Sequence, residues 1–112
     1  MSSYNKVVFL GNLTRDPELK FTQSGTAVGN FDIAVNSSHG SGDDKKEEVM
    51  FIGVTVWGKQ AENCSQYLKK GSQVLVDGRL KLETWQKDEK TCSKHVVIAN
   101  LVQFLNKKLE EA

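Results

Sequence analysis

The stretch "VTVWGK" (Val54–Lys59) places a tryptophan on the face of a predicted strand opposite to its valines. Val54 and Val56 alternate with Thr55 and Trp57, which is the period-2 pattern of a strand with one buried face. Successive side chains of a strand point to opposite faces, so the two valines are predicted to face a core. Trp57 then lies on the other face beside a threonine. A large ring in that position needs something to cover it.

The segments on either side of this stretch predict four more strands and one helix. The predicted strands cover 5–13, 27–36, 49–58, 72–85 and 94–105, and the predicted helix covers 59–71. Five strands with one helix between the third and the fourth is the order found in the OB-fold, a partly open Greek-key barrel. The sequence therefore predicts an all-β, five-stranded OB-fold barrel as one domain over 1–106, followed by a short charged end at 107–112.

Several local expectations accompany this layout. The first strand is apolar throughout and is expected to be buried on both faces, and Pro17 excludes a central strand just after it. The polar segment 37–48 is expected to be the least ordered loop. Lys69 and Lys70 are expected in the last helical turn, with Gly71 as the stop. The segment 86–93 is expected to be a turn-like connection.

The composition is that of an ordinary soluble domain. The 112 residues are 38% hydrophobic and 26% charged, and 15 Lys and Arg against 14 Asp and Glu leave a net charge of +1. The overall charge therefore does not indicate a polyanionic partner. No apolar run approaches the roughly 18–20 residues of a membrane span, and the N-terminus lacks the pattern of a secretory signal. We expect a cytoplasmic protein with no membrane partner.

The cysteines do not indicate a metal site. Cys64 and Cys92 lie far apart and outside any CxxC motif, and with His39 and His95 they could nominally supply four zinc ligands. Structural zinc sites usually contain closely spaced ligand pairs, and disulfides are rare in cytosolic proteins. We therefore expect two ordinary thiols, no metal and no cofactor.

Strand periodicity assigns most of the third and fourth strands to a core face and an outer face. The predicted core faces carry Met50, Ile52, Val54, Val56, Val74, Val76, Leu80 and Leu82. The predicted outer faces carry Phe51, Gly53, Thr55, Trp57, Leu75, Asp77, Arg79, Lys81, Glu83 and Trp85. A slip of one residue would bury the charges, so this register is strongly specified.

Aromatic rings interleaved with cations suit single-stranded nucleic acid. A base stacked on an aromatic ring gains about 1–3 kcal/mol with little regard to its identity, and Lys and Arg follow the phosphates. From the pattern alone, a subunit interface or a barrel-closing contact could cover Trp57 and Trp85 instead. Each charged residue taken singly fits a solvated face. The combination on an OB-fold, which often binds oligonucleotides, favours nucleic acid.

The stretches "NKVVFLGNLTRDPELKFTQSGTAVGNFDIAVNSS" and "VWGKQAENCSQYLKKGSQVLVDGRL", with the later "TW", resemble the bacterial single-stranded DNA-binding protein (SSB) family. The resemblance runs from about 5 to 102 and implies a homotetrameric OB-fold that binds and protects single-stranded DNA in replication, recombination and repair. By position it implies base-stacking roles for Trp57, Trp85 and Phe51. It implies phosphate contacts for Lys6, Lys59, Lys69, Lys70 and Lys81, and Arg79 joins this set by its place beside Lys81. Phe21 matches a further aromatic position, and Gly71 and Gly78 match structural glycines.

Three departures from the family pattern affect these expectations. His39 stands where family members often have a stacking tryptophan; an imidazole can also stack on a base, though more weakly, so His39 is expected among the nucleic-acid-binding residues. Glu83 stands where family members often have a basic residue, and it would repel phosphate locally. The family also continues into a flexible linker and an acidic tip that recruits replication and repair proteins, whereas this sequence stops at Ala112 after Glu110 and Glu111. Such partners are therefore expected only if a tail follows in the whole protein.

Two other functional classes are considered. A nuclease would need acidic metal ligands and a cation in one pocket, and Arg15, Asp16 and Glu18 flank Pro17 in a predicted surface turn. We expect no enzyme. The alternative is an OB-fold protein-interaction subunit or an SSB paralogue of the primosome-accessory type, with weak or no DNA binding. An RNA-binding protein is also compatible with stacking, which ignores the sugar unless its 2′-hydroxyl is contacted.

Overall fold

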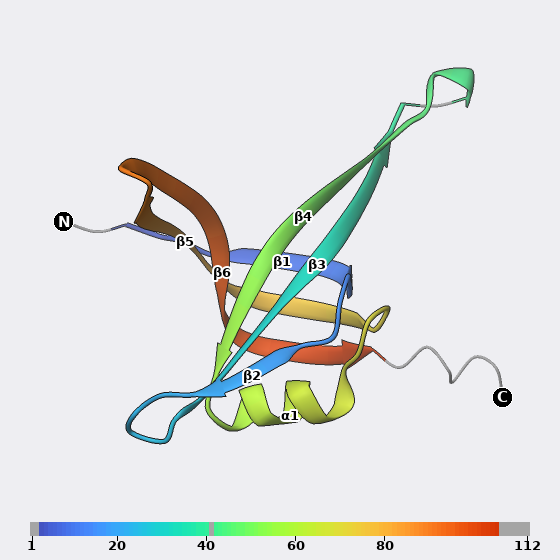
Figure 1. Cartoon of the computed structure of the whole chain (residues 1–112). Coiled ribbons are helices and arrows are strands. Elements are labelled where there is room, and N and C mark those ends of the chain that lie inside the picture. Colours follow the sequence, from blue (N-terminus) through green and yellow to red (C-terminus); the bar gives the residue numbers. More distant parts are fainter. Residues whose placement is uncertain (1–2, 41, 106–112) are drawn as a thin grey trace, which may run out of the picture.

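The computed structural model describes residues 3–40 and 42–105. Within these residues the chain forms six strands, one α-helix and one short 3₁₀ helix (Figure 1). They are β1 (Val7–Leu13), β2 (Glu18–Phe21), β3 (Ala27–His39), η1 (Gly42–Asp44), β4 (Lys46–Trp57), α1 (Lys59–Tyr67), β5 (Gln73–Lys87) and β6 (Lys90–Leu105). In this described part, no helix is both long and apolar enough to cross a membrane.

The strands close into a barrel. They are ordered β1-β5-β6-β4-β3-β2, and β1 also pairs with β3, so five strands form a ring and β2 is added at the edge of β3. The helix lies between β4 and β5, which are the third and fourth strands of that ring. The OB-fold prediction is therefore confirmed. The short β2 was not predicted, but its place at an edge directly after Pro17 agrees with the exclusion of a central strand.

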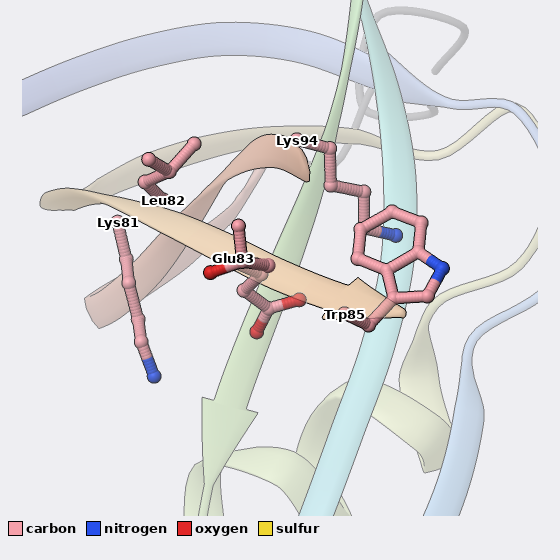
Figure 2. Close-up of a pocket in the computed structure, with 6 residues that line it drawn as sticks. Lys81, Leu82, Glu83, Trp85 and Lys94 are labelled. Carbon is pink, nitrogen blue, oxygen red and sulfur yellow. The ribbon is translucent and has the colours of Figure 1, made fainter. Parts of the chain in front are cut away.

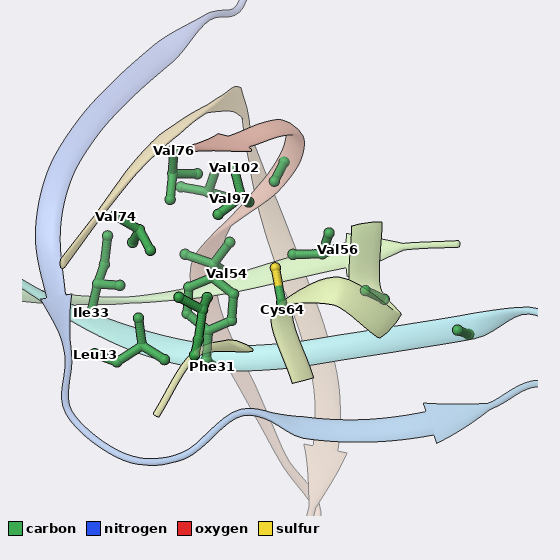
Figure 3. Packing of buried hydrophobic residues seen from close by; sticks show 14 residues of the cluster. Leu13, Phe31, Ile33, Val54, Val56, Cys64, Val74, Val76, Val97 and Val102 are labelled. Carbon is green, nitrogen blue, oxygen red and sulfur yellow. The ribbon is translucent and has the colours of Figure 1, made fainter. Parts of the chain in front are cut away.

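The core fills the barrel and is covered at one end by α1 (Figures 1 and 3). Its fully buried side chains include Phe31, Ile33, Val54, Val56, Val74, Val76, Val97 and Cys64. The helix packs closely on β3 because Gly29 has no side chain: a Cβ there would lie 3.3 Å from Ala61 Cβ. Burial raises the pKa of the Cys64 thiol to about 11, and Cys64 and Cys92 are not bonded to each other.

The expectation that the first strand is buried on both faces is wrong. Val8 and Leu10 are 50% and 47% exposed, while Gly11 and Leu13 on the other face are buried. The barrel has a single wall, so a strand has one side toward the core and one toward the outside. The outer side of β1 is thus apolar and uncovered in the described monomer.

The strands are longer than predicted, and the expectation that all of 37–48 is a loop is wrong. β3 and β4 pair as far as His39 and Lys46, which leaves only a short connection at the tip. The predicted connection at 86–93 is also mostly strand, because β5 and β6 pair as far as Lys87 and Lys90. The turn there places Asp88 and Glu89 at φ 53° and 67°, a conformation typical of two-residue hairpin turns.

The extended hairpins also change two burial predictions. Met50 and Leu82 have the predicted parity, but they are 41% and 53% exposed. Met50 pairs with Val35 and Leu82 pairs with His95, in the extended parts of the two hairpins, where both side chains stay open to solvent.

The helix ends earlier than predicted. The last residue of α1 is Tyr67. Leu68 follows in an extended conformation (φ −103°, ψ 153°) and is buried, at 7% exposure. Lys69 and Lys70 are therefore not in the last helical turn. Gly71 instead lies in the following turn at φ 93°, where its N–H donates to the Leu13 carbonyl at 2.8 Å.

Candidate nucleic-acid interface

The candidate site is the outer side of the barrel wall formed by β2, β3, β4, β6 and β5, which we call the outer sheet face. The pairing of the strands joins β3, β4, β6 and β5 into one continuous surface. Asp32 on β3 pairs with Gly53 on β4, which pairs with Val96 on β6, which pairs with Lys81 on β5. Paired residues point to the same side of a sheet. Side chains predicted separately for the third and fourth strands therefore share one surface.

Phe51 and Trp57 project from β4 onto this face. They are 65% and 49% exposed, and their partners on β3 are the small or medium-sized Ala34 and Val28. Lys20 on β2 pairs with Val28 in turn, so a cation lies in the same row as Trp57. Both rings have open surface that a flat ligand can cover.

Trp85 forms a second aromatic position, on the β5–β6 hairpin (Figure 2). The Lys94 ammonium nitrogen lies 5.9 Å from the centroid of the Trp85 ring, within cation–π range. A hollow of about 630 Å³ is lined by Lys81, Leu82, Glu83, Thr84, Trp85 and Lys94. Trp85 is 43% exposed. This end of the outer sheet face offers a ring and two cations together, with the Glu83 carboxylate among them.

The other predicted site residues are spread more widely. Lys6 precedes β1, and its ammonium nitrogen lies 3.2 Å from a carboxylate oxygen of Asp77. Asp77 is on β5, the strand that also carries Arg79. Lys59 begins α1, is 82% exposed at its side chain and lies 3.9 Å from a Glu62 oxygen. Lys69 and Lys70 follow the opposite end of the helix, so the structure does not bring them together with Lys59.

Two predicted residues have the opposite parity to the outer sheet face. Phe21 is 60% exposed but pairs with the buried Ala27, so it overhangs the inward side at the end of β2. His39 ends β3 in register with Lys46 and lies 3.5 Å from Glu48. Neither shares a face with Phe51 along regular strand geometry.

The segment considered for a nuclease does not assemble a metal site. Asp16 Oδ1 accepts a hydrogen bond from the Lys70 backbone N–H at 2.8 Å, which fixes the loop after α1. Arg15 pairs with Asp32. Among residues 3–40 and 42–105, no group of three His, Cys, Asp or Glu side chains is arranged to hold a metal ion.

The model of the Single-strand binding protein family matches residues 4–105. The chain belongs to this family. The resemblance drawn from the sequence motifs is thereby confirmed.

Curated relatives agree with this membership. The chain is 46% identical over 105 residues to the single-stranded DNA-binding protein of Treponema pallidum, covering 94% of the chain and 60% of that protein. It is 44% identical over 111 residues to single-stranded DNA-binding protein 2 of Chlorobaculum tepidum, covering 96% and 75%. The chain thus spans about three-fifths of the Treponema relative's length.

Solved structures show the same fold. A deletion mutant of the single-stranded DNA binding protein from Thermus aquaticus matches with a TM-score of 0.81 and 28% identity, covering 94% of this chain and 52% of that one. The Plasmodium falciparum SSB in complex with single-stranded DNA matches with a TM-score of 0.86 and 23% identity, covering 95% and 98%. At 23% identity, the match to the Plasmodium protein supports the fold alone.

Two cations on the outer sheet face were not predicted from the sequence. Lys20 was missed because β2 was not predicted. Lys94 was missed because the connection before it was placed in a loop. Counting outward from a two-residue turn at Asp88 and Glu89 pairs Lys94 with Glu83, so the hairpin register was the signal that could have found it.

Proposed function

We propose that the chain binds single-stranded DNA in a sequence-tolerant way along the outer sheet face. The observation that supports this most strongly is the exposure of Phe51, Trp57 and Trp85 on one continuous surface that also carries Lys81 and Lys94. An exposed set of large rings is unusual for a monomer surface without a binding role. Membership of a family of binding proteins supports the expectation that the chain is not an enzyme.

The proposed mechanism is binding without a chemical step. Bases stack on the rings, each stacked base contributing about 1–3 kcal/mol, and the lysines neutralise phosphates between them. A duplex hides its base faces in its own stack, so it cannot use the rings. The protein therefore holds strands open and protects them, which is the role we propose in replication, recombination and repair.

Fluorescence anisotropy of a labelled oligo(dT) tests this function. The expected result is saturable binding that unlabelled oligo(dT) competes away and duplex DNA of the same length does not. Parallel competition with oligo(rU) measures the preference for DNA over RNA. Absence of binding at low salt would favour the protein-interaction alternative instead.

We also propose that the chain forms a homo-oligomer through the outer side of β1, β5 and the C-terminal half of β6. Val8, Leu10 and Leu101 are exposed there, at 50%, 47% and 52%, and register places Leu75 beside Leu10. In addition, within 3–40 and 42–105 β1 pairs with β3 only at Asn12 and Leu13, so the neighbouring edge of β1 can pair with another copy. The number of four subunits is the family expectation.

Sedimentation of the wild type and of a Leu10→Asp/Leu101→Asp variant tests the oligomer. The expected result is a tetramer for the wild type and smaller species for the variant, because the charges would be buried in the interface. A monomeric wild type would contradict the proposal.

We further propose the cytoplasm, in association with the nucleoid, as its location. The predicted end at 107–112, and residue 106 before it, lie outside the described residues, and recruitment of replication and repair proteins through a following tail stays a prediction.

A further inference from the structure

A hollow opens in the outer sheet face at Gly53. Its volume is about 210 Å³, its charged lining residues are Arg15, Glu18, Asp32, Glu83 and Lys94, and Val96 is an apolar part of its lining. Gly53 supplies the space, because it leaves β4 without a side chain between Phe51 and Thr55. A Cβ at this position would lie 3.2 Å from Asp32 Oδ1 and 3.6 Å from Val96 Cγ1.

The polar groups of the hollow have a defined arrangement. Arg15 Nε donates to Asp32 Oδ2 at 3.0 Å, and the two side chains remain 50% and 42% exposed. Asp32 Oδ1 is the oxygen next to the space over Gly53. Thr55 Oγ1 donates to Asn30 Oδ1 at 3.0 Å. These two residues form the next cross-strand pair on the same face, beside the pair of Asp32 and Gly53. The hollow thus presents a carboxylate oxygen beside a guanidinium group.

We propose that this hollow receives the Watson–Crick edge of a base stacked on Phe51 and favours cytosine over thymine or uracil. The proposal rests on the proposed DNA binding. Successive residues on one face of a strand are about 7 Å apart. A base that stacks on the side of the Phe51 ring facing Gly53 therefore lies over the hollow. Its edge then meets Asp32 and Arg15, while Val96 forms an apolar floor that is 4% exposed.

The preference follows from donor and acceptor chemistry. Cytosine carries an amino group at its 4-position, and carboxylates accept hydrogen bonds from it. Its ring N3 and O2 are acceptors that the remaining guanidinium N–H groups of Arg15 can reach, since arginine has five N–H donors. Thymine and uracil have an oxygen at the 4-position, which a carboxylate repels. Trp57 pairs with Val28, which pairs with Lys20, so the row of Trp57 holds a cation and no carboxylate. The expected selectivity is therefore confined to the base at Phe51.

Competition binding with oligo(dC) and oligo(dU) of equal length tests the inference, since these two bases differ at the 4-position and not by a methyl group. The measured quantity is the ratio of the affinities for oligo(dC) and oligo(dU). Asp32→Asn replaces an acceptor with an amide that can donate to uracil O4, so we expect the ratio to fall by about fivefold. Gly53→Ala partly fills the hollow and is expected to lower the same ratio.

Asp43→Asn, in η1 at the hairpin tip, is the matched control because it removes the same charge outside the hollow and is expected to leave the ratio unchanged. An equal change in both affinities for Asp32→Asn would show a simple charge effect and overturn the inference. An unchanged ratio in both test variants would overturn it as well, while DNA binding itself would stand. If the wild type binds neither homopolymer, the proposed function fails and the inference falls with it.

Discussion

The ammonium nitrogen of Lys94 lies 5.9 Å from the centroid of the Trp85 ring, across the β5–β6 hairpin (Figure 2). The pairing of Glu83 with Lys94 and of Trp85 with Cys92 produces this contact. It places a cation at the ring on which a base would stack. With a base stacked on this ring, as proposed, the same cation can neutralise the phosphate of that nucleotide.

Lys94 and Lys81, which line the hollow beside Trp85, should contribute to the salt dependence of binding. Each phosphate contact on a single strand contributes about −0.7 to the slope of log affinity against log salt. Lys94→Ala and Lys81→Ala are each expected to make the slope shallower by about that amount, as measured by oligo(dT) titrations at several salt concentrations. Lys94→Arg keeps the charge and should retain the wild-type slope. A wild-type slope in both alanine variants would show that these lysines do not contact phosphate.

The two tryptophans should contribute to affinity and little to stability. Trp57→Ala and Trp85→Ala are each expected to weaken oligo(dT) binding by about 1–3 kcal/mol, with the melting temperature nearly unchanged because both rings are about half exposed. Tyr67→Ala is the matched control. Tyr67 is also exposed, at 64%, but it packs on Phe104 with ring centroids 6.3 Å apart, away from the outer sheet face. A variant that binds normally but changes its oligomeric state would assign that tryptophan to an interface.

Gly78 should be needed for the fold. It lies beside an irregularity in the β5–β6 pairing, and a Cβ there would approach the Ile98 carbonyl oxygen to 2.2 Å. Backbone must move to accept it, so Gly78→Ala is expected to lower the free energy of unfolding by about 3 kcal/mol or more. Gly25→Ala is the control, since no atom lies within 4 Å of its Cβ and only the φ of 91° opposes the change. Its expected cost is about 1 kcal/mol. Urea unfolding measures both, and equal costs would contradict the close contact.

Cys64 should make stability depend on pH in the alkaline range. Burial raises the pKa of its thiol from 9.0 to about 11. Above pH 9 the unfolded chain loses this proton while the folded chain keeps it, so stability falls as the pH rises toward 11. The expected loss is on the order of 2 kcal/mol. Urea unfolding of the wild type and of Cys64→Ala between pH 8 and about 11 measures the difference. Parallel pH profiles would contradict the assignment.

Much of the fold could be predicted from residue patterns because burial and periodicity agree there. Val54 and Val56 are 1% and 0% exposed, and alternation alone assigned them to the core. The helix was placed between the correct strands by the same reasoning. Its end was not, because Leu68 leaves the helix to fill the core. Tertiary packing of this kind overrides local helix signals.

The candidate site could be predicted only in part, because its surface is assembled by strand pairing. The outward positions of Phe51, Trp57 and Trp85 follow from parity within each strand. The rows that join Gly53 to Asp32 and Lys81 depend on register between distant segments, which composition does not specify. The hollow at Gly53 therefore had no signal in the sequence beyond a glycine in a strand.

Intrinsic tryptophan fluorescence during titration of the wild-type protein with oligo(dT), repeated at two salt concentrations, reports whether bases stack on Trp57 and Trp85. We expect strong quenching that saturates at low salt and weakens at high salt, because stacked bases quench the rings and the lysine–phosphate contacts are screened by salt. Unchanged fluorescence at low salt would mean that protein rather than DNA covers these rings, and it would contradict the proposed binding surface.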